Sequence, residues 1–149
     1  MLTTAAKNKF LTQLVGKSNS SLSGSVYIGL SSTAPNADGT GVTEPLSGGY
    51  ARTLIGSYSF SESQLFGSPS GGEVTNTKYI YFSESTGSWG DPLTHFVLFS
   101  NATSTDVNSV LAYAELQENG VAAPIVVSAE KTVVMFRPGK LTIKFLDAE

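Results

Sequence analysis

One short segment brings together residue types that could do chemistry. The stretch GSWGDPLTHFVLF, residues 87–99, contains the only tryptophan of the chain, Trp89, and the only histidine, His95, with Asp91 between them. Such a set suits a catalytic centre, a platform for sugar binding, or a loop and strand around which a β-protein is packed. The surrounding sequence decides among these three interpretations.

Packing explains Trp89 and His95 better than chemistry does. The sequence offers no second histidine and no cysteine, and carboxylates alone make a weak site for a transition metal. His95 falls at the start of an expected strand, where a hydrogen bond is enough to explain it. Trp89 lies between Ser88 and Gly90, so its ring either folds back over the core or faces outward to stack on a sugar. We favour the first interpretation.

Two other motifs resemble catalytic or metal-binding sequences, but both are incomplete. The string SAEK at 128–131 matches the Ser-x-x-Lys of penicillin-recognising enzymes, but the companion motifs Ser-Asp-Asn and Lys-Thr-Gly are missing. NADG at 36–39 resembles the start of a calcium loop, yet Pro45 occupies the position of the closing acid. We therefore expect no enzymatic activity, no cofactor and no metal site.

A glycosidase needs two carboxylates facing each other across the scissile bond. Twelve acidic residues are present, and Glu84, Asp91 and Glu115 fall near the ends of expected strands. Sequence spacing in a β-protein does not show which of them meet. A glycosidase is therefore kept only as a third functional hypothesis.

Composition excludes two classes of partner. Charged residues make up 14% of the 149 residues and the net charge is −3, whereas about 25% is usual. The two arginines, Arg52 and Arg137, are far apart and the lysines are scattered, so no cluster exists to bind a phosphate backbone. No apolar run approaches the roughly 20 residues that span a bilayer, and no signal peptide opens the chain. We expect a soluble protein made in the cytoplasm, with neither nucleic acid nor membrane as partner.

The first 16 residues are predicted to form an amphipathic helix. Leu2, Ala6, Phe10 and Leu14 recur at a spacing of four, while Thr3 or Thr4 can cap the start and Gly16 can end the helix. A helix this short is marginal on its own and must bury its apolar stripe against something. Leu2, Phe10 and Leu14 are therefore candidate assembly contacts, and the Ser/Gly-rich link at 18–25 gives the helix reach beyond its own domain.

From residue 24 to 149 the apolar pattern has a period of two. Short runs rich in β-branched and aromatic residues alternate with Gly, Pro, Asn and Asp, which predicts a mainly β fold, an antiparallel, jelly-roll-like β-sandwich in a single domain. Two long connections, 31–49 and 61–72, are functional or mobile by their length. The expected core consists of Val26, Ile28, Ile80, Phe82, Phe96, Leu98, Leu111, Val134, Phe136, Ile143 and Phe145.

Several segments together resemble small structural proteins of tailed bacteriophages and prophages. They are LTTAAKNKFL, VYIGLSSTAP, GGYARTLI, GSWGDPLTHFVLF and VVMFRPGKLTIKFLD, in this order along the chain. The resemblance implies a virion protein rather than an enzyme: a capsid decoration or tail-associated subunit that assembles on a symmetric scaffold. Other virion proteins are then the expected partners. Neutral, polar loops suit packing between identical copies, so we also expect a homo-oligomer.

The leading alternative is a binding module for host-surface carbohydrate. Aromatic side chains stack on sugar rings while loop amides and carboxylates hold the hydroxyl groups. Trp89, Tyr50 and Tyr58 are the candidates for such stacking.

Overall fold

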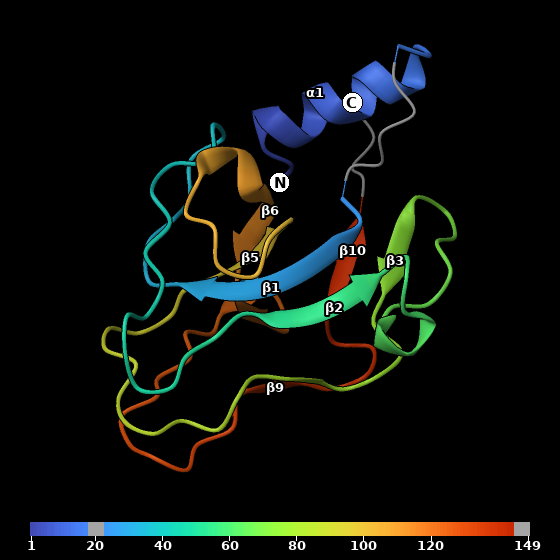
Figure 1. Ribbon diagram of the computed structural model, residues 1–149. Helices are drawn as coiled ribbons and strands as arrows, with labels where there is room; N and C mark the ends of the chain where they lie inside the picture. Colours follow the sequence, from blue (N-terminus) through green and yellow to red (C-terminus); the bar gives the residue numbers. More distant parts are fainter. Residues whose placement is uncertain (18–22, 145–149) are drawn as a thin grey trace.

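A computed structural model describes residues 1–17 and 23–144 (Figure 1). One helix precedes a series of short strands, with two single-turn 3₁₀ helices among them. The elements are α1 (Thr4–Leu14), β1 (Ser25–Ser31), β2 (Thr53–Ser57), η1 (Ser61–Ser63), β3 (Glu73–Thr75), β4 (Ile80–Tyr81), β5 (His95–Phe99), η2 (Val107–Ser109), β6 (Val110–Glu115), β7 (Gln117–Glu118), β8 (Val121–Ala122), β9 (Met135–Phe136) and β10 (Thr142–Lys144).

The main sheet has four antiparallel strands in the order β2-β1-β5-β6. Pairing of Ile28 with Leu98 and of Leu30 with Phe96 sets the register between β1 and β5. β5 is an inner strand, and its last three residues are all buried. A strand covered on both faces needs apolar residues on both faces, which is why polar and apolar residues do not alternate along β5.

Short two-stranded ribbons form the layer opposite this sheet. β4 pairs with β9 and β3 pairs with β10, both antiparallel. Ile80, Phe82 and Val134 belong to the same buried cluster as the main-sheet residues Ile28 and Leu98. The predicted mainly β, antiparallel fold with one N-terminal helix is confirmed. Its second layer is divided into ribbons because turns and loops interrupt the paired segments.

Most of the expected core is buried, with four exceptions. Ile28, Ile80, Phe82, Leu98, Leu111 and Val134 are buried as predicted. The prediction was wrong in degree for Val26, Phe96, Phe136 and Ile143, which are only partly buried and pack against the core. The physical reason is their position along grooves between the layers, which leaves one side of each side chain uncovered. Phe145 lies outside the described residues.

The other face of the main sheet is covered by loops. Val97, Phe99 and Val110 form a second buried cluster, with Val42 of the connection between β1 and β2 packed against it. The long connection predicted at 31–49 therefore serves as a cover for the sheet.

Residues before the helix extend the main sheet at its β6 edge. The Thr3 amide donates to the Leu111 carbonyl (2.9 Å), and the Tyr113 amide donates to the Met1 carbonyl (2.9 Å). At the opposite edge, the Leu65 amide donates to the Ile55 carbonyl of β2 (3.0 Å). Backbone groups on both edges of the sheet thus find partners within the chain.

Helix α1 starts and stops where its capping residues predict. The Thr3 hydroxyl accepts from the Ala6 amide (3.3 Å) and donates to the Val110 carbonyl (2.6 Å). Gly16 has a φ of 73°, the left-handed conformation that ends a helix. Leu2 precedes the helix and forms an isolated β-bridge with Ala112. Among the described residues, no helix has the length and apolar character required to cross a membrane.

Candidate functional site

The two halves of α1 have opposite environments. At the start, Thr3 and Ala6 are completely buried, and the Thr4 amide donates to the Ala37 carbonyl (2.8 Å). Toward the end, Leu11, Leu14 and Val15 have exposed fractions of 53%, 67% and 64%. Residues three and four apart share a helix face, so these three side chains form one exposed apolar stripe. We call Leu11, Leu14 and Val15 the α1 stripe.

The candidate assembly contacts fall into two groups. Leu2 is partly buried against the main cluster of its own domain, whereas Phe10 and Leu14 lie on the helix with exposed side chains. Leu11 and Val15 were not among the candidate contacts. Leu11 lies three positions before Leu14 and four before Val15, and this spacing is the signal that could have identified the three together.

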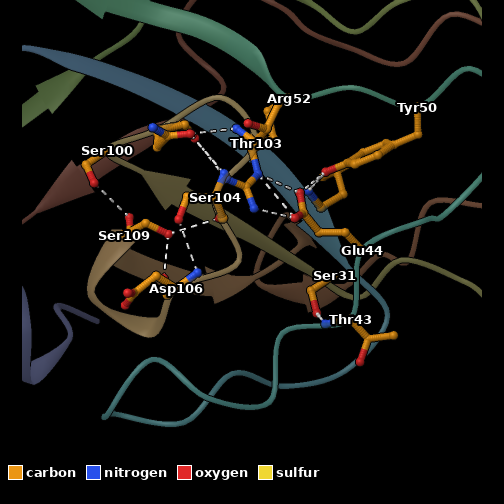
Figure 2. Close-up of polar contacts among 12 residues, drawn as sticks. Ser31, Thr43, Glu44, Tyr50, Arg52, Ser100, Thr103, Ser104, Asp106 and Ser109 are labelled. Carbon is orange, nitrogen blue, oxygen red and sulfur yellow. Dashed lines mark hydrogen bonds and ion pairs between the residues drawn. The ribbon is translucent and has the colours of Figure 1, made fainter.

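A buried ion pair holds the connection between β1 and β2 in place. Arg52 Nη2 lies 2.6 Å from Glu44 Oε2, and the two side chains are 4% and 17% exposed. Arg52 Nε also donates to both carboxylate oxygens, at 3.0 and 3.1 Å. Figure 2 shows the Tyr50 hydroxyl pointing at the same carboxylate, to which it donates at 2.6 Å. We call Glu44, Tyr50 and Arg52 the loop lock.

The loop lock also contacts the main sheet and a second loop. The Arg52 guanidinium carbon lies 3.3 Å from the centroid of the Phe99 ring, a cation–π contact. Its Nη1 donates to the Asn101 carbonyl (2.8 Å), and the Tyr50 hydroxyl accepts from the Leu30 amide (2.8 Å). Burial, reinforced by the Glu44 carboxylate, raises the pKa of Tyr50. This network is built to fix structure, because its polar groups are directed at one another.

The loop that follows β5 has its own hydrogen bonds. Asn101 Oδ1 accepts from the Thr103 and Ser104 amides, both at 2.9 Å. Asp106 Oδ1 accepts from the Asn108 amide (2.8 Å), and the Ser109 hydroxyl donates to the Asp106 carbonyl (2.6 Å) (Figure 2). The loop thus presents a fixed polar surface beside Arg52.

Comparison with known families identifies the chain. The family model described as Podophage GP4 fiber I protein gp80 matches residues 1–134. The chain belongs to this phage fibre family. A search of the curated proteins found no match. The resemblance to phage structural proteins is thereby confirmed, and the fibre protein is a tail-associated structural protein of the virion.

In this fibre protein the Trp89 ring folds back into the core, as predicted. Trp89 is buried, and its Nε1 donates to the Gly48 carbonyl (2.9 Å). Its ring packs edge to face against the Tyr50 ring, with 5.2 Å between the ring centroids. His95 opens β5 partly buried, with Nδ1 2.8 Å from the Thr94 hydroxyl. Trp89 is covered, whereas Tyr50 is partly buried, with its ring against Trp89 and Phe82 and its hydroxyl in the loop lock.

Tyr58 differs from the other two candidates for sugar stacking. Its side chain is 93% exposed, and its amide donates to the Gly24 carbonyl (3.1 Å). Gly24 lines a groove of about 570 Å³ whose other lining residues are mostly hydroxyl or amide bearing: Ser23, Ser25, Tyr27, Ser59, Ser100, Asn101, Ala102 and Thr103. Of the three candidates, Tyr58 is exposed, Tyr50 is partly buried and Trp89 is buried.

The acidic residues considered for catalysis are dispersed. Glu84, Asp91 and Glu115 are exposed on three different segments, and within residues 1–17 and 23–144 no group of three or more His, Cys, Asp or Glu could hold a metal ion. Asp38 belongs to a turn in which its Oδ1 accepts from the Thr40 hydroxyl (2.6 Å) and amide (3.0 Å). These two hydrogen bonds lower the pKa of Asp38.

Proposed function

We propose that the fibre protein is a tail subunit whose copies associate with one another through the α1 stripe to assemble on a symmetric scaffold. The observation that carries this proposal is the contrast within α1. Its first turn is fixed to the domain by Thr3 and Ala6, while Leu11, Leu14 and Val15 remain exposed on one face.

Fixing the start of the helix favours docking through its end. A preorganised element loses less conformational freedom on binding than a flexible one. Contiguous exposed apolar side chains mark interaction sites on soluble proteins. The low net charge of −3 keeps repulsion between identical copies small.

A pair of charge substitutions tests the role of the stripe. Leu14→Asp puts a charge on the α1 stripe, and Gln13→Asp puts the same charge on a neighbouring exposed position that points to another face. We expect sedimentation and light scattering to show oligomers for the parent chain and for Gln13→Asp, and monomers for Leu14→Asp. Both variants should unfold with nearly unchanged free energy, within about 0.5 kcal/mol of each other, because both sites are exposed.

Two results would contradict association through α1. One is a parent chain that stays monomeric at high concentration. The other is a Leu14→Asp variant that assembles as well as Gln13→Asp does. A variant that unfolds much more easily while still assembling would show that the stripe packs against its own domain.

A second candidate function is binding of host-surface carbohydrate beside Tyr58. The supporting observation is the nearly complete exposure of the Tyr58 side chain, together with a groove rich in hydroxyl groups that is lined by its chain neighbour Ser59 and by Gly24, the acceptor of its amide. On a glycan array, Tyr58→Ala should lose any binding that the parent shows, whereas Tyr81→Ala, at a half-exposed tyrosine on β4, should keep it. Equal binding by both variants would exclude Tyr58 as the contact.

A further inference from the structure

A mixed polar and apolar groove lies between the β7–β8 hairpin and the turn that links β9 to β10. Its volume is about 710 Å³, within the range of small-molecule sites. One wall carries Gln117, Glu118 and Asn119, and the other carries Arg137 and Lys140. The groove is separate from the α1 stripe and from the groove beside Tyr58, since none of its lining residues occurs in either.

The wall that carries Arg137 and Lys140 is held rigidly by one buried amide. Asn76 Nδ2 donates to the Arg137 carbonyl (2.9 Å), and its Oδ1 accepts from the Leu141 amide (2.9 Å). The Asn76 carbonyl accepts from the Gly139 amide (2.7 Å), and within the turn the Lys140 amide donates to the Arg137 carbonyl (3.1 Å). Asn76 is almost completely buried. The turn is therefore fixed before any ligand arrives.

The two cations of this turn are available for a ligand. Arg137 and Lys140 are exposed, and neither forms a salt bridge with any residue that the structure describes; the ion pairs found there are Arg52–Glu44 and Lys144–Glu73. In a chain with a net charge of −3, two unpaired cations on one rigid turn make a local site for an anion. A guanidinium and an ammonium together fit a carboxylate, which accepts from both.

The rest of the groove suits a hydroxyl-bearing ring. Ile125 and Phe136 are partly buried and supply apolar contact, while Leu116 is buried beneath them. The amides of Gln117 and Asn119 both donate and accept, and the Glu118 carboxylate accepts from hydroxyl groups. An acidic peptide would meet repulsion from Glu118, and a polyphosphate would find too few cations.

We propose that this groove binds a saccharide bearing a carboxylate, with the acid group at Arg137 and Lys140 and the hydroxyl groups at the opposite wall. The site does not depend on association through α1. Failure of one proposal therefore leaves the other intact.

Calorimetric titration with methyl galacturonoside, which carries a single carboxylate, tests the assignment, and its methyl ester serves as the neutral partner with the same ring. The parent chain should bind the acid, and the ester should bind at least about tenfold more weakly because it lacks the charge. Arg137→Gln and Lys140→Gln should each weaken binding of the acid by about tenfold, with affinity falling as salt rises. Lys9→Gln removes an equal charge from an exposed position on α1 and should bind as the parent does.

Three outcomes would overturn the proposal. The first is equal affinity for the acid and its ester. The second is unchanged binding in both Arg137→Gln and Lys140→Gln. The third is complete displacement of the galacturonoside by an equal concentration of inorganic phosphate, which would mean that the turn binds a simple anion without contacting the sugar ring. Circular dichroism of each variant checks that the fold is retained.

Discussion

Gly29 of β1 lies so close to Glu44 that a side chain at position 29 would collide with the loop lock. A Cβ built there would be 2.6 Å from Glu44 Oε1 and 2.8 Å from both the Phe99 ring and the Tyr50 hydroxyl. We predict that Gly29→Ala lowers the free energy of unfolding by roughly 1–3 kcal/mol, as overpacking does. Gly56→Ala on the neighbouring strand β2, where a Cβ would meet no atom within 4 Å, is the matched control. Equal losses in urea denaturation of the two variants would contradict the steric explanation.

Removing Arg52 should be costly because it leaves the Glu44 carboxylate poorly solvated and without its cation. We predict that Arg52→Met lowers the free energy of unfolding by about 3–5 kcal/mol. The double variant Arg52→Met with Glu44→Gln should be more stable than the single one, because a neutral amide still accepts from Tyr50. Chemical denaturation of the three proteins gives the comparison, and a double variant no better than Arg52→Met would argue against an uncompensated charge.

The raised pKa of Tyr50 predicts a loss of stability at alkaline pH. A tyrosine in the unfolded chain ionises near pH 10, whereas burial and Glu44 keep Tyr50 protonated in the fold. The stabilisation from Tyr50 is therefore fully present below about pH 10 and decreases as the pH rises above that value. At pH 7 the parent should be about 1–3 kcal/mol more stable than Tyr50→Phe, which lacks the hydroxyl. Denaturation at pH 7 and pH 11 should show this difference narrowing; a constant difference would refute the linkage.

Asn76 should be among the most sensitive polar positions of the fold. Replacing it by alanine removes a donor for the Arg137 carbonyl and an acceptor for the Leu141 amide. The Arg137 carbonyl still accepts from the Lys140 amide, but the buried Leu141 amide is left without an acceptor, so Asn76→Ala should lower the free energy of unfolding by about 1–3 kcal/mol. Asn108→Ala, at an exposed asparagine, is the control and should change the unfolding free energy little. Similar melting temperatures for the two variants would show that the turn does not need Asn76.

Local patterns in the sequence predicted the helix and the strands of the main sheet, but not the β7–β8 ribbon or all of the pairings. The apolar run of His95–Phe99 predicted a central strand, and β5 occupies that position in the sheet. The pairing of Met1 and Thr3 with β6 was not predicted, because a backbone contact between Thr3 and Leu111 leaves no trace in the spacing of neighbouring residues. Val26 and Ile143 show the same limit, since an alternating pattern gives the face of a side chain and not how completely that face is covered.

Sequence analysis did not predict the loop lock or the hydrogen bonds of Asn76, because the burial of both depends on contacts with segments that are distant along the chain. Asn76 lies in the segment TNTK, where asparagine is typical of a turn, and burial of its amide depends on residues 137–141, the distant turn between β9 and β10. A signal for the loop lock did exist. Glu44 and Arg52 are the only charged residues between Asp38 and Glu62, and an isolated pair of opposite charges in a neutral segment favours mutual contact.

The backbone pairing at both edges of the main sheet also limits how copies of the fibre protein can associate. Open-ended filaments of β-proteins grow when each new chain adds a strand to an unpaired edge. Here Met1–Thr3 pair along β6, and the Leu65 amide meets the Ile55 carbonyl on β2. These contacts occupy part of each edge and disfavour growth of that sheet from one copy into the next. We therefore expect copies of the fibre protein to meet through side-chain surfaces, in a number set by the particle, and not by continuing the sheet from chain to chain.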